Sequence, residues 1–566
     1  MSRYRSIRAI VGLLGVVLIV FGALNIVAPK AEAVGARHDP ISGIGSSWSA
    51  NALDQWIRNV GNNYGWKIEY DSVGSSTGRA RFRDSTPDFA VSEIPYELRD
   101  SDVQDPRPTR GFAYMPIVAG GTAFMYNLVV GGNQITNLRL SGESLTKIFT
   151  GVITTWNDPA IAADNPSLAL PAIPVIPVVR SDGSGTTAQF TSWMRAQYPG
   201  LYSDYCARIG KANCGITSTF PFAPGSSFIA QASSNQVAGY VATAAYVGSI
   251  TYVEYSYALN TGMPVAKVLN NGGYYTEPLA PAVAVSLLAA RINQDSSSPD
   301  YLTQDLTGVY NNADPRSYPL SSYSYMIIPT AIEAGFTEEK GLTLGDFAQY
   351  FLCEGQQQAD VLGYSPLPIN LASAGLEQVK RVPGSNSNGK DISACNNPTF
   401  SPDGTNKLAN DAPFPSECDK VGAIQCTVGT GGAQAATAPS AGAAAAAGTD
   451  PAIAAAAAAG GNAAVLDVNA KPITVTGVPV SIDPIDLLTS PNIVATVLGI
   501  LLLGGLLVPP WWAKRQRSRE HPKTLFETGP APVPANAASP GDRVAKVRLP
   551  FTRRKREKSA PTTPRP

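Results

Sequence analysis

A strand, a loop of small residues and a helix follow one another between residues 173 and 198, and this unit constrains the fold most strongly. The apolar, β-branched run Val175–Val179 predicts a buried strand that ends at Arg180. Ser181–Thr187 is a loop of small and polar residues, and Ala188–Tyr198 carries large apolar side chains at helical spacing. A buried strand that feeds a helix through a short loop is typical of α/β layers.

The same loop has the chemistry of an anion cradle. Free N–H groups at a helix N-terminus, together with the helix dipole, favour negative charge. Arg180 can add a two-pronged donor, Ser184, Thr186 and Thr187 can add hydroxyls, and Asp182 is near enough in sequence to hold the guanidinium. The alternative is a plain helix N-cap, which Ser and Thr also favour. A nucleotide-binding P-loop is excluded, since no lysine follows the second glycine.

Similar polar loops recur earlier in the chain. The predicted strand Trp66–Tyr70 runs into the glycine- and serine-rich loop 71–78, and the short strand Pro87–Val91 is followed by Glu93. Ser46–Ser49 precede a helical pattern of apolar residues. Because loops at the carboxyl ends of strands meet in α/β sheets, we expect these loops and the 181–187 loop to form one site.

Further strands and helices alternate along the chain, so the predicted class is α/β. Tyr114–Asn127 is predicted to be two strands broken at Gly120 and Gly121. Ile250–Ala258 and Tyr318–Pro329 are predicted strands.

The N-terminal residues 1–33 have the pattern of a secretory signal peptide. Basic residues precede the apolar run Ile10–Val27, and Ala31–Ala33 matches a cleavage site after Ala33. The alternative is an uncleaved signal anchor. Absence of cysteine near this point excludes an N-terminal lipid anchor there.

All six cysteines lie in the part predicted to be exported, where disulfides form. The short spacings favour Cys206 with Cys214 and Cys418 with Cys426, which leaves Cys353 with Cys395. Six cysteines permit about fifteen connectivities, so the pairing stays open at this stage.

A second apolar run, Ile493–Val508, ends at Trp511 and Trp512 and is followed by basic residues. About 20 residues suffice to cross a bilayer, and basic residues mark the cytoplasmic side. We therefore expect a single-pass membrane protein with its main domain outside the cell and a basic, disordered tail inside. A cell-wall sorting signal is the alternative, but no LPxTG sequence precedes the run.

The formal net charge is zero, which gives no indication of nucleic-acid binding.

Six segments occur in an order that resembles a known family. They are GIGSSWSANALDQW (43–56), YDSVGSSTG (70–78), DFAVSEIP (88–95), LSGESLTKIFTGVITTWNDPAI (140–161), VVRSDGSGTT (178–187) and YVEYSYA (252–258). Over residues 38–385 the chain resembles the PstS-like phosphate-binding receptors of phosphate-specific ABC transporters. The resemblance implies a class II periplasmic-binding-protein fold, in which two α/β lobes with a hinge close on inorganic phosphate and pass it to ABC permease subunits. It implies no cofactor and no metal.

The resemblance also implies the ligand-binding residues. Glu93 stands where the family usually has Asp and accepts the proton of monohydrogen phosphate; Trp48 stands where the family has Phe. Glu is longer by one methylene, a reach of about 1 Å, so affinity or oxyanion selectivity is expected to depart from the family, and Glu93→Asp is expected to tighten binding or leave it unchanged. The implied phosphate ligands are Ser47, Trp48, Ser75, Glu93, Arg180, Ser184, Gly185 and Thr186, with Asp182 supporting the arginine.

The expected function is extracytoplasmic phosphate capture for ABC-type import. A surface phosphate sensor or adhesion protein that retains the binding fold is the alternative, and a phosphatase is a weaker one. The chain has two histidines, His38 and His521, so a histidine base or histidine metal cluster in the site is not expected.

The expected organisation is a signal peptide (1–33), a binding domain (34–385) with lobes 38–118 plus 319–385 and 119–318, a cysteine-containing polar segment (386–432), an Ala/Gly-rich spacer and membrane-proximal stretch (433–490), a transmembrane helix (491–512) and a tail (513–566).

Overall fold

The computed structural model describes residues 37–102, 104–211, 214–386, 395, 397–435 and 437, all within one unit, Met1–Ala458. The predicted signal peptide (1–33), the transmembrane segment (491–512), the tail (513–566) and nearly all of the spacer (433–490) lie outside the described residues. Within the described ranges, no helix combines the length and the apolar character needed to cross a membrane.

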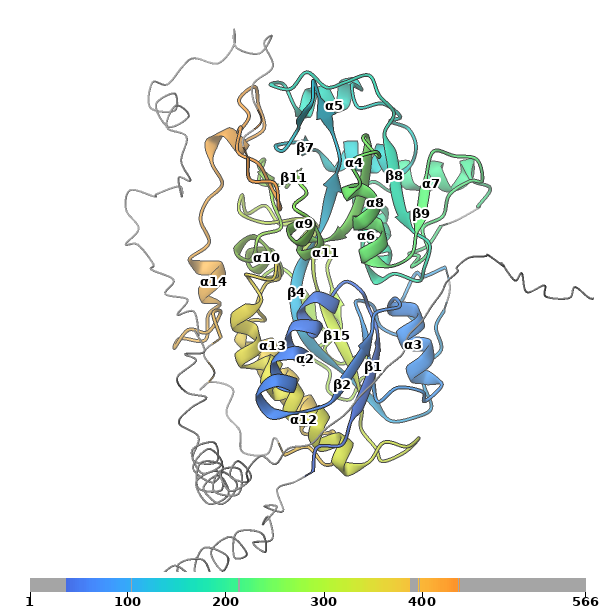
Figure 1. The fold of residues 1–566 in the computed structure, drawn as a ribbon, viewed down its shortest axis with the longest axis vertical. Helices are drawn as coiled ribbons and strands as arrows, with labels where there is room; N and C mark the ends of the chain where they lie inside the picture. The colour runs from blue at the N-terminus through green and yellow to red at the C-terminus, as the bar shows by residue number, and fades with distance from the viewer. Residues whose placement is uncertain are drawn as a thin grey trace, which may run out of the picture. The chain divides into compact units, whose positions relative to one another are not determined.

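Strands and helices alternate through the described chain (Figure 1). The long path of the main sheet uses β1 (Ile41–Gly45), β2 (Ile68–Asp71), β3 (Phe89–Ser92), β4 (Phe112–Tyr126), β8 (Ile176–Arg180), β9 (Ile229–Gln231), β10 (Ser249–Glu254) and β15 (Ser321–Pro329). Shorter strands are β5 (Val129–Val130), β6 (Asn133–Gln134), β7 (Arg139–Leu140), β11 (Val265–Leu269), β12 (Tyr275–Thr276), β13 (Arg291–Ile292) and β14 (Gln304–Asp305). The helices are α2 (Ala50–Tyr64), α3 (Ser75–Arg83), α4 (Gly142–Phe149), α5 (Pro159–Asp164), α6 (Gly185–Gln197), α7 (Pro199–Arg208), α8 (Ser233–Ala242), α9 (Tyr255–Thr261), α10 (Ala280–Leu287), α11 (Thr307–Tyr310), α12 (Glu338–Leu352), α13 (Ile369–Val379) and α14 (Lys407–Asn410), with 3-10 turns η1 (Glu354–Gln358) and η3 (Glu417–Asp419).

The strand order is β2-β1-β3-β15-β4-β10-β8-β9. β1 pairs in parallel with β2 and β3, and β8 pairs in parallel with β10 and β9. The long strands β4 and β15 are antiparallel to each other and join these two parallel groups. The α/β class predicted from the sequence is confirmed, and the carboxyl ends of the parallel strands carry the polar loops identified there.

The main apolar cores lie at opposite ends of the β4–β15 pair, and both strands contribute to the first. The first is built from Ile41–Ala119 and Tyr323–Val382, with Val283 joining it, and we call the elements around it lobe 1. The second is built from residues 123–320, and we call its surroundings lobe 2. Trp56 stacks on Phe351 in the first core, and aromatic rings of β4, α4 and α6 cluster in the second. The apolar residues of lobe 2 form two clusters, and a further small cluster, of Ala284, Val285, Ala409 and Ala412, packs α10 against α14.

The prediction that Gly120 and Gly121 break a strand is wrong. β4 runs through both glycines, which pair with Ser322 and Ser321 of β15. The glycines serve close packing instead, because a Cβ on Gly120 would lie 2.8 Å from the Trp48 ring and one on Gly121 would lie 2.4 Å from Pro278. Glycine in a strand often marks such a close approach.

The predicted strand Ile250–Ala258 is also too long. β10 ends at Glu254, whose carboxylate accepts a hydrogen bond from the Ser256 N–H (2.8 Å) and caps α9. The β-branched and aromatic composition of the segment favours a strand, but the cap starts a helix within it.

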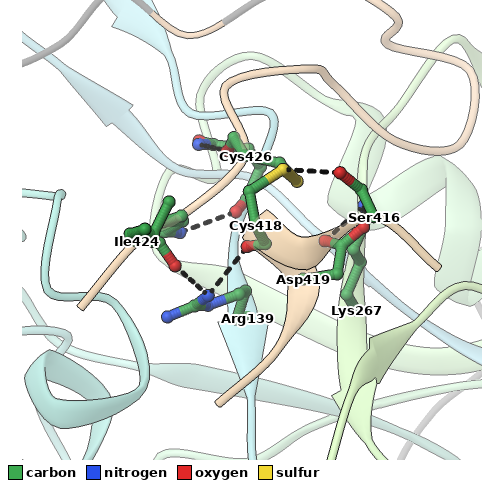
Figure 2. The surroundings of a disulfide bond; sticks show 9 residues. Arg139, Lys267, Ser416, Cys418, Asp419, Ile424 and Cys426 are labelled. Carbon is green, nitrogen blue, oxygen red and sulfur yellow. Dashed lines mark hydrogen bonds and ion pairs between the residues drawn. A yellow bond between two sulfur atoms is a disulfide. The ribbon is translucent and has the colours of Figure 1, made fainter. Parts of the chain in front are cut away.

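The three disulfides pair Cys206 with Cys214, Cys353 with Cys395, and Cys418 with Cys426, which confirms the pairing that the spacings favoured. We call residues 395–437 the extension: Cys353–Cys395 ties its first residue to the end of α12, and Cys418–Cys426 closes a loop within it. It contacts lobe 1, where Thr399 Oγ1 donates to the Leu367 carbonyl (2.6 Å). It also contacts lobe 2 (Figure 2), where the buried Arg139 donates to main-chain carbonyls of the extension at Cys418 (3.3 Å) and Ile424 (2.9 Å).

Candidate anion-binding site

Helix α6 supplies the donor end of the site. Ser184 is its N-cap, and the Ser184 Oγ accepts a hydrogen bond from the Thr187 N–H (3.2 Å), so a serine caps the helix at this loop. The Gly185 N–H donates to Ser75 Oγ of α3 (3.1 Å), which joins the two lobes. Thr186 Oγ1 is buried and has no hydrogen-bond partner among the described residues. The cap therefore leaves a buried hydroxyl at the helix N-terminus.

Arg180 lies at the end of β8 with its guanidinium buried, at 2% exposure. Its Nε donates to Asp182 Oδ1 (2.6 Å), its Nη2 donates to Asp182 Oδ2, and its Nη1 donates to Ser234 Oγ (3.2 Å). The bidentate pair fixes the plane of the guanidinium. A buried arginine next to a helix N-terminus makes this end of the site electropositive.

Glu93 provides an acceptor directly after β3. Its carboxylate is 1% exposed, and none of the ion pairs in the described part of the chain includes it. Oε2 accepts a hydrogen bond from Ser75 Oγ (2.7 Å), and Oε1 accepts one from Ser324 Oγ (2.6 Å). A Cβ on Gly185 would lie 2.0 Å from Glu93 Oε2, so the carboxylate rests against the start of α6.

Ser47 and Trp48 follow β1 and complete the lobe 1 side. Ser47 Oγ lies 2.9 Å from Ser234 Oγ and accepts a hydrogen bond from the Ser234 N–H (3.0 Å). The Trp48 N–H donates to Ser46 Oγ (3.0 Å), and its indole N–H is buried with no partner among the described residues. The contacts of the site thus form two groups: Ser47 and Arg180 meet through Ser234, and Ser75 contacts both Glu93 and Gly185.

Two serines of the site were missed by the sequence reasoning. Ser234, in the first turn of α8, bridges Ser47 and Arg180, and Ser324 of β15 contacts Glu93. The available signals were weak, namely the Ser233-Ser234 pair before a helical pattern and the alternation of serine with tyrosine in SSYSY (321–325). Neither pattern indicates which residue the serine contacts.

The tyrosines around the site are neutral hydrogen-bonding groups. Burial raises the pKa of Tyr252 to about 12, and its hydroxyl lies 2.8 Å from Thr187 Oγ1 and accepts from the Arg180 N–H (3.2 Å). Burial also raises the pKa of Tyr257, whose hydroxyl donates to the Ser47 carbonyl (2.5 Å).

His38 is hydrogen-bonded to Asp346, and the described residues contain no group of three or more acidic, histidine or cysteine side chains arranged to hold a metal.

Comparison with known proteins decides the family. Residues 30–354 match the model of the PBP superfamily domain. The phosphate-binding protein PstS of Xylella fastidiosa is 32% identical over 344 residues, which are 61% of this chain and 85% of that protein. The chain belongs to the family of PstS-like phosphate-binding receptors.

A second curated relative and a solved structure are similar to a comparable share of the chain. Phosphate-binding protein PstS 2 of Mycobacterium tuberculosis is 29% identical over 332 residues, or 57% of this chain and 82% of that protein. The solved structure of the periplasmic phosphate-binding protein PfluDING with bound phosphate is 20% identical over 59% of this chain and 92% of that one, with a TM-score of 0.45. The extension of this PstS-like chain lies beyond the residues that match the superfamily model.

Proposed function

We propose that this chain is an extracytoplasmic receptor that binds monohydrogen phosphate between lobe 1 and lobe 2 and delivers it to an ABC permease. The receptor domain is residues 34–385, with lobes 38–118 plus 319–385 and 119–318. The proposed ligands are the side-chain or main-chain groups of Ser47, Trp48, Ser75, Glu93, Arg180, Ser184, Gly185 and Thr186, and Asp182 holds Arg180 in place.

The donor end of the site supports an anionic ligand. Arg180 is buried and oriented by Asp182, and it lies at the end of the strand that leads into the N-terminus of α6. The hydroxyl of Thr186 is buried without a partner in the described chain, which is a costly arrangement unless a ligand or water accepts from it or donates to it. An oxyanion with several oxygens can satisfy these donors together.

The observation that carries the proposal is the buried carboxylate of Glu93 beside those donors. A carboxylate with no cation partner repels an oxyanion unless the ligand brings a proton to share. Monohydrogen phosphate has one O–H group that can donate to Glu93, whereas sulfate at neutral pH has none. The site is therefore suited to a singly protonated oxyanion.

Binding rather than catalysis is proposed for these groups. The site offers donors and one carboxylate acceptor, and the chain's two histidines are His38, which is bonded to Asp346, and His521 in the predicted tail. Activation of a serine nucleophile needs an adjacent base. No enzymatic step is therefore assigned to Ser75 or Ser184.

A membrane-anchored receptor is the proposed cellular arrangement. The signal peptide 1–33 would export the domain, and the apolar segment 491–512 with its basic flank would anchor it with the tail 513–566 in the cytoplasm. The Ala/Gly-rich spacer 433–490 would separate the receptor domain from the bilayer.

Calorimetric titration of the full-length chain in mild detergent with phosphate tests the function. We expect saturable one-to-one binding that Arg180→Ala abolishes. Arg83→Ala is the matched control, because Arg83, the last residue of α3, forms its ion pair in the described part of the chain with the adjacent Asp84. This variant should bind phosphate like the unmodified chain. Absence of phosphate binding by the unmodified chain would refute the proposed function.

A further inference from the structure

Ser324 of β15 faces the site because of the alternation of its strand. The neighbouring Tyr323 and Tyr325 are fully buried in the core of lobe 1. The Tyr323 hydroxyl donates to the Leu302 carbonyl (2.9 Å), and the Tyr325 hydroxyl accepts from the Gln304 main-chain N–H (2.7 Å). Successive side chains of a strand point to opposite faces, so Ser324 points away from this core. The pairing of Tyr325 with Ser92 brings Ser324 next to Glu93.

The pairing between β15 and β4 is irregular beside Ser324. Ser324 pairs with Val118 of β4, whereas Tyr325 pairs with Pro116, so the register shifts between them. The extra residue, Ile117, belongs to β4, so β15 keeps the side-chain alternation that directs Ser324 away from the core of lobe 1. Here the shifted register accompanies a hydroxyl that lies 2.6 Å from Glu93 Oε1.

A serine hydroxyl donates a hydrogen bond to each of the two carboxylate oxygens of Glu93. Ser324 donates to Oε1 and Ser75 donates to Oε2, and all three side chains are nearly or fully buried. The two serines differ in their other contacts. Ser75 Oγ also accepts from the Gly185 N–H at the start of α6, whereas the Ser324 hydroxyl contacts Glu93. Ser75 thus lies on the ligand side and Ser324 on the supporting side.

We propose that Ser324 is a positioning residue that fixes Glu93 so that Oε2 is presented to the proton of the bound oxyanion. This inference rests on the proposed function. When the ligand O–H donates to Oε2, Ser75 can turn its hydroxyl to another ligand oxygen, while Ser324 keeps the carboxylate in place. The extra methylene of Glu93 is thereby accommodated, and Ser324 makes the site specific for Glu at this position.

This role reverses the expectation for Glu93→Asp that the family resemblance suggested. Removal of one methylene withdraws the carboxylate by about 1.5 Å, the length of a carbon–carbon bond. A contact of 2.6 Å would then exceed hydrogen-bond distance. We therefore expect Glu93→Asp to weaken phosphate binding rather than to tighten it.

Titration calorimetry of the full-length protein with inorganic phosphate tests the proposal. A hydrogen bond to a charged group contributes about 1.5–3 kcal/mol, so Ser324→Ala should weaken binding by about tenfold or more. Ser324→Thr, which retains the hydroxyl, should stay within about threefold of the unmodified chain. Ser322→Ala is the matched control, because Ser322 lies two residues away on the same strand, is buried, and has no hydrogen-bond partner in the described chain.

A double-mutant cycle with Glu93→Asp separates positioning from general support of the fold. In the Glu93→Asp chain, Ser324→Ala should cost less than about twofold, because the contact is already lost. Equal costs of Ser324→Ala in both chains, or a cost no larger than that of Ser322→Ala, would overturn the proposal. If Ser324→Ala does not fold, Ser324→Cys, a near-isosteric weak donor, takes its place in the same cycle with the same expected outcomes. Phosphate binding by the unmodified chain without a Ser324 effect refutes this inference alone, whereas no phosphate binding refutes the proposed function.

Discussion

Glu93 and Gly185 come from different lobes, yet the Glu93 carboxylate lies so near the Gly185 α-carbon that a Cβ there would be 2.0 Å from Oε2. The acceptor is therefore pressed against the first residue of α6, where the helix N–H groups begin. This contact explains why the loop requires a glycine at residue 185. A side chain there would separate the carboxylate from the helix N-terminus.

Gly185→Ala should weaken phosphate binding by about 100-fold or more, because the added methyl displaces the Glu93 carboxylate. Titration calorimetry measures the loss, and the melting temperature reports any effect on folding. Gly200→Ala on α7 is the control, since nothing lies within 4 Å of a Cβ at that position. Unchanged affinity in Gly185→Ala would contradict the described contact between the lobes.

Arg180→Lys tests whether the fork of the guanidinium, rather than its charge, is required. Lysine keeps the positive charge but cannot make the bidentate contact with Asp182 while also donating to Ser234. We expect phosphate affinity to fall by about 100-fold, measured by calorimetry. Arg83→Lys, at a local surface pair, should bind normally. Retention of full affinity in Arg180→Lys would show that charge alone suffices.

Glu254→Gln should change the pH dependence of stability. Glu254 is fully buried at the β10–α9 junction, and burial raises its pKa well above the ordinary value. The folded chain thus holds this proton more tightly than the unfolded chain does. The Glu254 carboxyl therefore contributes fully to the free energy of unfolding at pH values below about 4.3, its pKa in the unfolded chain. This contribution is lost as the pH rises through the raised pKa of the folded chain.

Glutamine stays neutral and can still accept from the Ser256 N–H. The melting temperature of Glu254→Gln relative to the unmodified chain should therefore increase from pH 5 to pH 8. Glu377→Gln, on a side chain with 63% exposure, controls for the chemical change. A difference in melting temperature that does not vary with pH would argue against a raised folded pKa at Glu254.

The Cys418–Cys426 disulfide should stabilise the extension without affecting the site. The two cysteines are separated by 8 residues, and closure of so short a loop contributes about 2–3 kcal/mol. The double change Cys418→Ser with Cys426→Ser should lower the free energy of unfolding by about that amount, measured by denaturant titration. Phosphate affinity should remain within about twofold. A tenfold loss of affinity would mean that the extension supports closure of the lobes.

Local sequence patterns predicted much of this molecule. The strand–loop–helix units around Arg180 and Ser75 follow from apolar runs, small residues and capping hydroxyls, which are short-range signals. The disulfide pairs followed from short spacings. The partners in these units and in two of the disulfides lie close in the chain. The third disulfide was predicted because Cys353 and Cys395 were the two cysteines left over.

Long-range partners escaped prediction. Ser324 is 231 residues from Glu93, and Ser234 is 187 residues from Ser47, so their contacts depend on the register of β15 and on the docking of α8. The extension was predicted as a polar segment because few of its residues are large and apolar, and Arg139 of lobe 2 holds it by donating to its main-chain carbonyls. Such acceptors leave no trace in side-chain composition.

The most direct test of the central claim is a paired titration of the full-length chain and of Glu93→Gln with phosphate and with sulfate at the same neutral pH. If Glu93 is the acceptor for the ligand proton, the unmodified chain binds phosphate and excludes sulfate. Glutamine replaces the repelling charge with a neutral group that can donate, so Glu93→Gln should gain sulfate binding and lose discrimination by about 100-fold. Sulfate binding as tight as phosphate binding in the unmodified chain would contradict the account.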